Sequence, residues 1–175
     1  RQVLEKLRES GMTLKISKCK LLRTDLIYLG HRVSAAGIEM DSTKAEAIND
    51  YATPKTKDEV RSFIGVLSYY RGFIPEFSTI AEPLIKLLRK GTEFAWSTEQ
   101  QGAFEVLKGA LLKPPILKYP NYQKPFFIAT DASSVGLGSA LLQESEGKLF
   151  PTSYASRSLN KAERNYSTTK REALA

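Results

Sequence analysis

The sequence predicts an α+β fold, with β-hairpins near both ends of the chain and helices between them. Three patterns carry this prediction. Residues 14–33 interleave basic and apolar side chains, residues 41–112 repeat apolar side chains at helical spacing, and an aromatic run at residues 125–131 leads through a Gly-containing turn into a second apolar run. A chain of 175 residues can bury a real core as one domain or two small ones.

The N-terminal segment is strongly basic. Residues 1–37 contain eight Lys or Arg and three acidic residues, so they carry +5 of the formal net charge of +7. Lys15 and Lys18 alternate with apolar residues as on a hairpin with one polar face, and Tyr28 lies beside them. A basic sheet face suits contact with a phosphate backbone, and the alternative is a solubilising surface.

The middle of the chain is predicted to be a helical bundle. We expect four helices, near residues 42–49, 56–70, 80–90 and 97–111. Thr56 and Glu59 form a capping box for the second helix, and Gly91 ends the third. The aromatic residues at 69, 70 and 73 could stack on a nucleic acid, although core packing is the commoner use of such a stripe. Prolines at 114, 115 and 120 place a domain boundary near residue 115.

A strand near the C-terminal end finishes on a carboxylate. Residues 126–129 suit a buried strand, Asp131 follows them, and the chain returns at residues 137–143. An Asp at the end of a strand is held rigidly and can meet a divalent cation. The alternative is a plain hairpin in which Asp131 caps the turn.

A second carboxylate, Glu172, lies in a segment predicted to be a helix starting at Asn160. Asn160 and Glu163 give a capping-box-like start, and Glu172 falls on or near the inward stripe with Thr169 and Ala173. A metal ion or a cationic partner would offset the cost of such a carboxylate. The alternative is a solvated charge beside Lys170 and Arg171.

The cysteine and histidine counts limit the metal chemistry. One Cys and one His cannot form an intramolecular disulfide or a zinc site, so any metal must take oxygen ligands, with Mg²⁺ the default. No apolar run approaches the roughly 18 residues needed to cross a bilayer, so we expect an intracellular protein with no membrane partner.

Motifs across the whole chain resemble the pol polyprotein of LTR retrotransposons of the gypsy class. In the first forty residues they are Lys18-Cys19, Tyr28-Leu29-Gly30-His31, Val33-Ser34 and Gly37-Ile38. In the middle they are Pro54, residues 60–74, Pro83-Leu84, Phe94-Ala95-Trp96 and Pro115-Ile116-Leu117. In the last part they are Thr130-Asp131-Ala132-Ser133, Gly136, Gln143, Tyr154, Ser156-Arg157 and Glu172-Ala173-Leu174-Ala175.

The resemblance implies three parts. Residues 1–40 would be the end of a reverse transcriptase palm, 41–115 its thumb and connecting helices, and 116–175 the N-terminal half of a ribonuclease H-like domain with three antiparallel strands and one helix. The nucleic-acid-binding residues that the resemblance implies are those of the primer-grip-like hairpin: Tyr28, Leu29, Gly30 and His31. We expect three basic residues, Lys15, Lys18 and Arg71, to bind nucleic acid as well, because of the basic N-terminal face and the aromatic residues beside Arg71.

The resemblance also implies a catalytic role for the two carboxylates. Asp131 and Glu172 match two of the four carboxylates that hold two Mg²⁺ ions, or Mn²⁺ ions, while the RNA strand of an RNA/DNA hybrid is cut. Implied partners are that hybrid, the primer-template, and the rest of the pol polyprotein with its protease, palm and fingers, and integrase. The implied location is a cytoplasmic virus-like particle, with room for a nuclear phase.

The sequence departs from the family's pattern in several places. Lys20, Tyr51 and Lys170 stand where the family usually has an aromatic residue, a Trp and an acidic residue. The Tyr-x-Asp-Asp palm motif and two further ribonuclease H aspartates are absent, so we expect these 175 residues to be inactive by themselves.

Two alternatives remain. A non-catalytic nucleic-acid-binding remnant would keep the basic surface without the chemistry. A sugar-kinase-like or actin-like ATPase also places an Asp before a Gly-containing hairpin, but it needs a second such hairpin in a duplicated domain.

Overall fold

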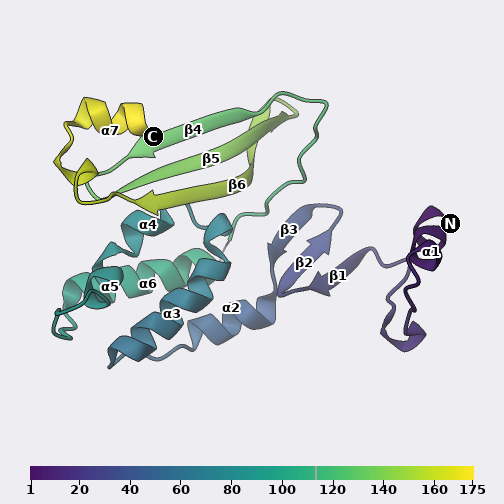
Figure 1. Cartoon of the computed structure of the whole chain (residues 1–175), viewed down its shortest axis with the longest axis horizontal. Helices are drawn as coiled ribbons and strands as arrows, with labels where there is room; N and C mark the ends of the chain where they lie inside the picture. The colour runs from purple at the N-terminus through teal and green to yellow at the C-terminus, as the bar shows by residue number, and fades with distance from the viewer. Residues whose placement is uncertain (113) are drawn as a thin grey trace.

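The structure, a computed structural model, describes residues 1–112 and 114–175. It contains two three-stranded antiparallel sheets and a layer of helices (Figure 1). One sheet lies at the end of the helical layer and the other lies across it. The predicted α+β fold class is confirmed.

The first residues form a helix, α1 (Gln2–Glu9), and a short 3-10 helix, η1 (Ile16–Lys18). The prediction that Lys15 and Lys18 belong to a hairpin is wrong, because the first strand starts only at Asp25. The side chains of Leu14 and Ile16 are exposed, so this segment has no apolar layer that would hold two paired strands together.

The first sheet consists of β1 (Asp25–Tyr28), β2 (His31–Ser34) and β3 (Gly37–Met40), in that order. Leu29 and Gly30 join β1 to β2, and both have positive φ angles, 49° and 76°. Two such residues define the type I′ turn, whose twist matches that of the flanking strands. The sheet therefore presents the Tyr28–His31 turn at one end.

The helical layer follows, with five α-helices and one short 3-10 helix. Its helices are α2 (Ser42–Asn49), α3 (Lys57–Tyr69), α4 (Phe77–Ile80), α5 (Glu82–Leu87) and α6 (Thr98–Leu112), with a 3-10 helix η2 (Arg71–Phe73) after α3. The Thr56 hydroxyl accepts a hydrogen bond from the Glu59 N–H at 3.2 Å, as the predicted cap requires. Phe63 of α3 and Phe104 of α6 pack with their ring centroids 4.7 Å apart at the centre of the core.

One predicted helix is shorter than expected. Residues 80–90 were expected to form a single helix, but α5 runs only from Glu82 to Leu87, and Ile80 is the last residue of α4. Pro83 lies at the start of α5, where its missing N–H costs nothing, whereas it would break a hydrogen bond inside a longer helix.

The second sheet consists of β4 (Phe127–Ala132), β5 (Gly136–Ser145) and β6 (Lys148–Ser158), in that order. Asp131 pairs with Gly138 of β5, and Gly138 pairs with Ser156 of β6. Helix α4 packs against β5 and β6, so the sheet lies directly on the helical layer (Figure 1).

The last helix is shorter than predicted. Asn160 and Glu163 do form the reciprocal cap, but it encloses a 3-10 turn, η3 (Glu163–Asn165), and α7 (Thr168–Leu174) starts after a new cap at Ser167. Tyr166 is extended, with ψ at 147°, so the chain changes direction between the two helical segments. Among the described residues, no helix is long and apolar enough to span a membrane.

Candidate functional site

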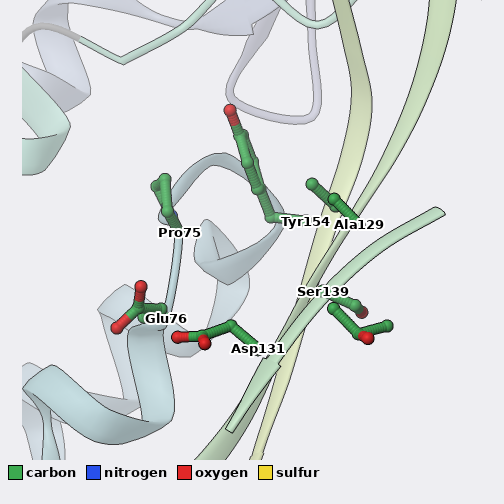
Figure 2. Close-up of a pocket in the computed structure, with 9 residues that line it drawn as sticks. Pro75, Glu76, Ala129, Asp131, Ser139 and Tyr154 are labelled. Carbon is green, nitrogen blue, oxygen red and sulfur yellow. The ribbon is translucent and has the colours of Figure 1, made fainter. Parts of the chain in front are cut away.

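Asp131 lies in β4 with its side chain exposed on a pocket of about 170 Å³. The pocket lies between the second sheet and the loop that leads into α4. Its lining includes Pro75, Glu76, Ala129, Gly138 and Tyr154 (Figure 2). Because β4 pairs with β5 along its whole length, the sheet holds the Asp131 backbone in place.

Glu76 faces Asp131 from the helical layer. Figure 2 shows the Asp131 side chain extending toward Glu76. The Glu76 backbone has a φ of 51°, a left-handed conformation that is uncommon for a residue with a side chain. Its Cγ lies 3.1 Å from the position that a Cβ on residue 138 would occupy, so Gly138 makes room for it. No local sequence pattern predicted that Glu76 would lie beside Asp131.

The carboxylate oxygens at this pocket are of the type that Mg²⁺ and Mn²⁺ prefer. Within residues 1–112 and 114–175, however, no three His, Cys, Asp or Glu side chains gather into a metal-binding group. Asp131 therefore fits the role of one ligand, and a complete site needs carboxylates beyond those gathered here.

Glu172 lies in α7, and the prediction that it faces inward is wrong, because its side chain is exposed. Helix α7 packs against β4 at the edge of the sheet away from the helical layer (Figure 1). Arg171 fixes this arrangement by donating to the Ser133 carbonyl oxygen at 3.0 Å. The segments that carry Asp131 and Glu172 are thus neighbours, and joint metal binding by the two carboxylates stays a prediction.

The turn at Tyr28–His31 is held by the C-terminal end of α3. The Tyr69 hydroxyl donates to the Leu29 carbonyl oxygen at 2.6 Å, and the Tyr70 hydroxyl donates to the Gly30 carbonyl oxygen at 3.3 Å. The His31 ring packs on three aromatic rings, those of Tyr69, Tyr70 and Phe73. Burial, and secondarily the neighbours Tyr69 and Asp41, raise the pKa of Tyr70.

The outer side of this turn remains open. Tyr28 and Leu29 are 63% and 66% exposed, so they can contact a ligand while His31 and Gly30 hold the turn. Tyr70 and Phe73 are buried, in line with the structural use of the aromatic stripe, whereas Tyr69 is half exposed.

The three basic residues predicted to bind nucleic acid do not form one cluster, because Arg71 lies apart from Lys15 and Lys18. Lys15 and Lys18 are exposed around η1. Arg71 lies at the junction with the second sheet, where its guanidinium donates to the Ser156 carbonyl oxygen and lies over the Phe77 ring at 5.7 Å. Arg71 therefore has a structural contact that the sequence did not predict.

Comparison with protein families gives a match over residues 96–175, to the RNase H-like domain found in reverse transcriptase. Over 174 residues, 99% of the chain, it is 37% identical to the retrovirus-related Pol polyprotein from transposon 412 of Drosophila melanogaster. It is also 32% identical over its full length to the transposon Tf2-3 polyprotein of Schizosaccharomyces pombe. Residues 96–175 thus match an RNase H-like domain found in reverse transcriptase, and the whole chain is similar in sequence to retrotransposon Pol polyproteins. It spans only 14% and 13% of the length of these two relatives.

Solved structures show the same fold. The foamy viral protease-reverse transcriptase dRH in complex with double-stranded DNA has a TM-score of 0.81 at 24% identity, covering 99% of this chain and 31% of that one. The foamy viral protease-reverse transcriptase in complex with RNA/DNA hybrid has a TM-score of 0.79 at 24% identity, covering 99% and 24%. The whole chain, including both sheets and the helical layer, therefore follows an arrangement already seen in reverse transcriptases.

Proposed function

We propose that this chain is part of a retrotransposon reverse transcriptase with ribonuclease H activity, whose parent polyprotein copies RNA into DNA and cuts the RNA of RNA/DNA hybrids. The observation that carries the proposal is the position of Asp131. It lies within the RNase H-like match, on a paired strand, with its carboxylate exposed at an open pocket.

In this proposal Asp131 and Glu172 each supply a carboxylate to a divalent-metal site that further carboxylates of the parent complete. The metal ions would activate a water molecule and stabilise the leaving oxygen. The chain's own contribution is positional: the β4–β5 pairing holds Asp131, and the Arg171–Ser133 contact holds α7 beside it.

The Tyr28–His31 turn is the proposed contact for the primer-template. Its exposed side chains lie on a turn whose two carbonyl oxygens are held by Tyr69 and Tyr70. A rigid turn with open apolar and aromatic side chains suits stacking against a nucleic-acid end, and the exposed lysines around η1 would add phosphate contacts elsewhere on the chain.

The deciding experiment is Asp131→Asn in a protein that contains this chain and completes the ribonuclease H domain. We expect cleavage of a labelled RNA/DNA hybrid in Mg²⁺ or Mn²⁺ to fall to background while hybrid binding stays within about twofold, because the change removes a metal ligand but no phosphate contact. Glu144→Gln, an exposed position on the same sheet, is the matched control.

A non-catalytic nucleic-acid-binding remnant is the competing outcome. It predicts hybrid binding without cleavage in the unsubstituted protein, and no effect of Asp131→Asn on any measured activity. Cleavage that survives Asp131→Asn would instead show that Asp131 is not a ligand of the reacting metal.

A further inference from the structure

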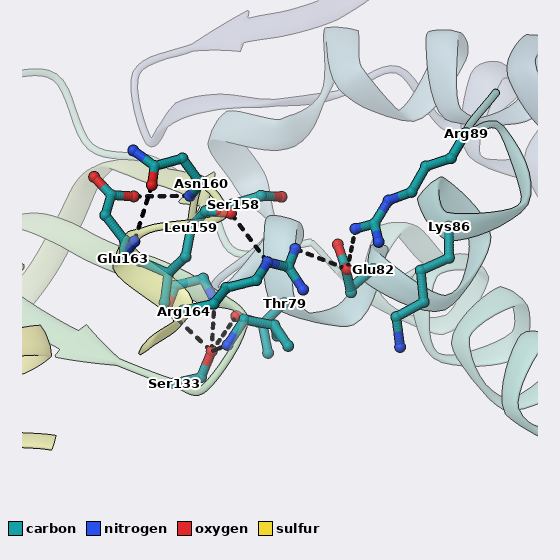
Figure 3. Close-up of polar contacts among 12 residues, drawn as sticks. Thr79, Glu82, Lys86, Arg89, Ser133, Ser158, Leu159, Asn160, Glu163 and Arg164 are labelled. Atoms are coloured by element: carbon teal, nitrogen blue, oxygen red, sulfur yellow. Dashed lines mark hydrogen bonds and ion pairs between the residues drawn. The ribbon is translucent and has the colours of Figure 1, made fainter. Parts of the chain in front are cut away.

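A buried carboxylate joins the helical layer to the second sheet. Glu82, in the first turn of α5, has a side chain that is only 3% exposed. Its Oε1 accepts hydrogen bonds from Arg89 Nη2 at 2.7 Å and from Arg164 Nη2 at 2.9 Å (Figure 3). Arg89 follows α5 in the helical layer, whereas Arg164 belongs to η3, after the last strand.

Burial makes the Glu82 carboxylate dependent on compensating partners. A carboxylate removed from water costs several kcal/mol unless cations and hydrogen bonds compensate it. Glu82 Oε2 is buried and has no hydrogen-bond partner among the described residues, so the compensation comes through Oε1 alone. Arg164 can reach that oxygen only when η3 lies directly against α5, which favours one docked position.

Hydrogen bonds and an ion pair hold the 3-10 turn that carries Arg164. Arg164 Nε donates to the Leu159 carbonyl oxygen at 3.2 Å. The Glu163 carboxylate accepts from the Asn160 N–H at 2.8 Å and from both terminal nitrogens of Arg157, at 2.7 and 3.1 Å. Because Arg157 lies in β6, the position of Arg164 is tied to the second sheet.

A second contact lies one turn earlier along the helical layer. Thr79 Oγ1 is 3.1 Å from Ser133 Oγ, in the turn that follows Asp131 (Figure 3). The Ser133 hydroxyl also accepts the N–H of Gly136 at 2.9 Å, and its carbonyl oxygen accepts from Arg171 at 3.0 Å. Ser133 therefore links α4, the turn after β4, and α7.

We propose that Glu82 is a positioning residue that docks the second sheet and α7 on the helical layer, with Arg164 as its partner across the interface. Thr79 holds the turn after Asp131 through Ser133, and Glu82 holds η3, the segment that precedes α7, through Arg164. Glu82 thereby sets the spacing between the Tyr28–His31 turn and the predicted metal ligands. This last step rests on the proposed function, whereas the docking itself does not.

Amide hydrogen exchange of the 175-residue chain tests the docking. We expect Glu82→Gln to speed exchange at residues 133–136 and in α7 by about ten- to a hundredfold, the size expected for losing a hydrogen bond to a charged group. Glu99→Gln is the matched control, because Glu99 is exposed and pairs with Lys86 at 3.8 Å within the helical layer. Equal exchange in the two variants would overturn the proposal.

Two arginine variants keep the test decisive if Glu82→Gln does not fold. Arg164→Met should speed exchange at residues 133–136 and in α7, whereas Arg89→Met removes a partner on the same side of the interface and should affect mainly α5. In a double-mutant cycle, Glu82→Gln and Arg164→Met should be strongly non-additive. Additive effects, or the same exchange pattern for both arginine variants, would rule out Glu82–Arg164 docking.

The spacing role needs the complete reverse transcriptase. With a hybrid labelled at one end, Glu82→Gln should spread the cut positions relative to the primer end, while Glu99→Gln leaves them unchanged. A Glu82→Gln protein with an unaltered cut pattern would overturn the spacing role. If the unsubstituted protein makes no cuts, the proposed function fails, and the exchange measurements still decide the docking.

Discussion

The Tyr70 hydroxyl oxygen lies 2.6 Å from the position that a Cβ on residue 30 would occupy. Gly30 therefore meets two requirements at once, since its φ of 76° disfavours a side chain and the Tyr70 ring leaves no room for one. The helical layer and the Tyr28–His31 turn are in contact at this point, which explains how α3 can hold a turn that lies forty residues earlier in the chain.

The first prediction is that Gly30→Ala destabilises the protein by about 1–3 kcal/mol, through backbone strain and displacement of Tyr70. Thermal unfolding followed by circular dichroism measures the change. Gly65→Ala is the matched control, because residue 65 lies inside α3 with open space around its Cβ position. We expect that control to stabilise the protein by about 0.5–1 kcal/mol, and a Gly30→Ala protein as stable as this control would contradict the clash.

The second prediction concerns acid. The hydrogen bond from Arg157, and secondarily the one from the Asn160 N–H, hold the pKa of Glu163 below its ordinary value. Such a group stabilises the fold above its unfolded pKa, about 4.3, and this stabilisation is lost as the pH falls through the lower folded value. Glu163→Gln should thus lower the melting temperature at pH 7, with the difference from the unsubstituted chain shrinking below about pH 4.

Glu144→Gln serves as the control for the acid series, since residue 144 is exposed on β5. A Glu163→Gln difference that stays constant from about pH 7 down to pH 3 would show that the Arg157–Glu163 pair does not contribute through its charge.

The third prediction is that hybrid binding by this chain depends steeply on salt and on the exposed lysines around η1. Each phosphate contacted in duplex DNA contributes about −0.9 to the slope of log affinity against log salt. Reversing the charge at Lys15 and Lys18 should weaken binding to all sequences alike and make the slope shallower, whereas Lys44→Glu, in α2, should do neither. Binding that is unchanged between roughly 50 and 200 mM salt would exclude a phosphate-based contact.

The fourth prediction is that the 175-residue chain neither synthesises DNA nor cuts hybrid RNA. Its described residues do not gather three metal-ligating side chains, and both reactions need carboxylates that hold two metal ions. The assay compares this chain with a version extended by about 80 residues, a length taken from ordinary domain sizes. Cleavage by the short chain that disappears with Asp131→Asn would show that the residues described here suffice.

Local sequence determined most of the secondary structure. Thr56 and Ser97 precede helices whose apolar residues, such as Phe63 and Phe104, recur on one face, and the structure confirms both helices. Gly30 suits the β1–β2 turn because glycine readily adopts a positive φ, whereas the positive φ of Leu29 is not a local preference of its side chain. These elements were predictable because caps, turns and periodicity act over a few neighbouring residues.

The tertiary structure alone decided which polar residues meet. Glu82 and Arg164 are 82 positions apart in the sequence, and nothing in the residues around either one distinguishes it from an ordinary surface charge. In the structure they nevertheless share a buried contact. Glu76 and Asp131 face one pocket for the same reason, since packing α4 on the second sheet brings them together. The start of α7 was not predicted correctly, because the Asn160–Glu163 cap begins a single 3-10 turn instead of a long helix. Contacts with Arg157 and Glu82 hold this turn in place, and the chain changes direction after it.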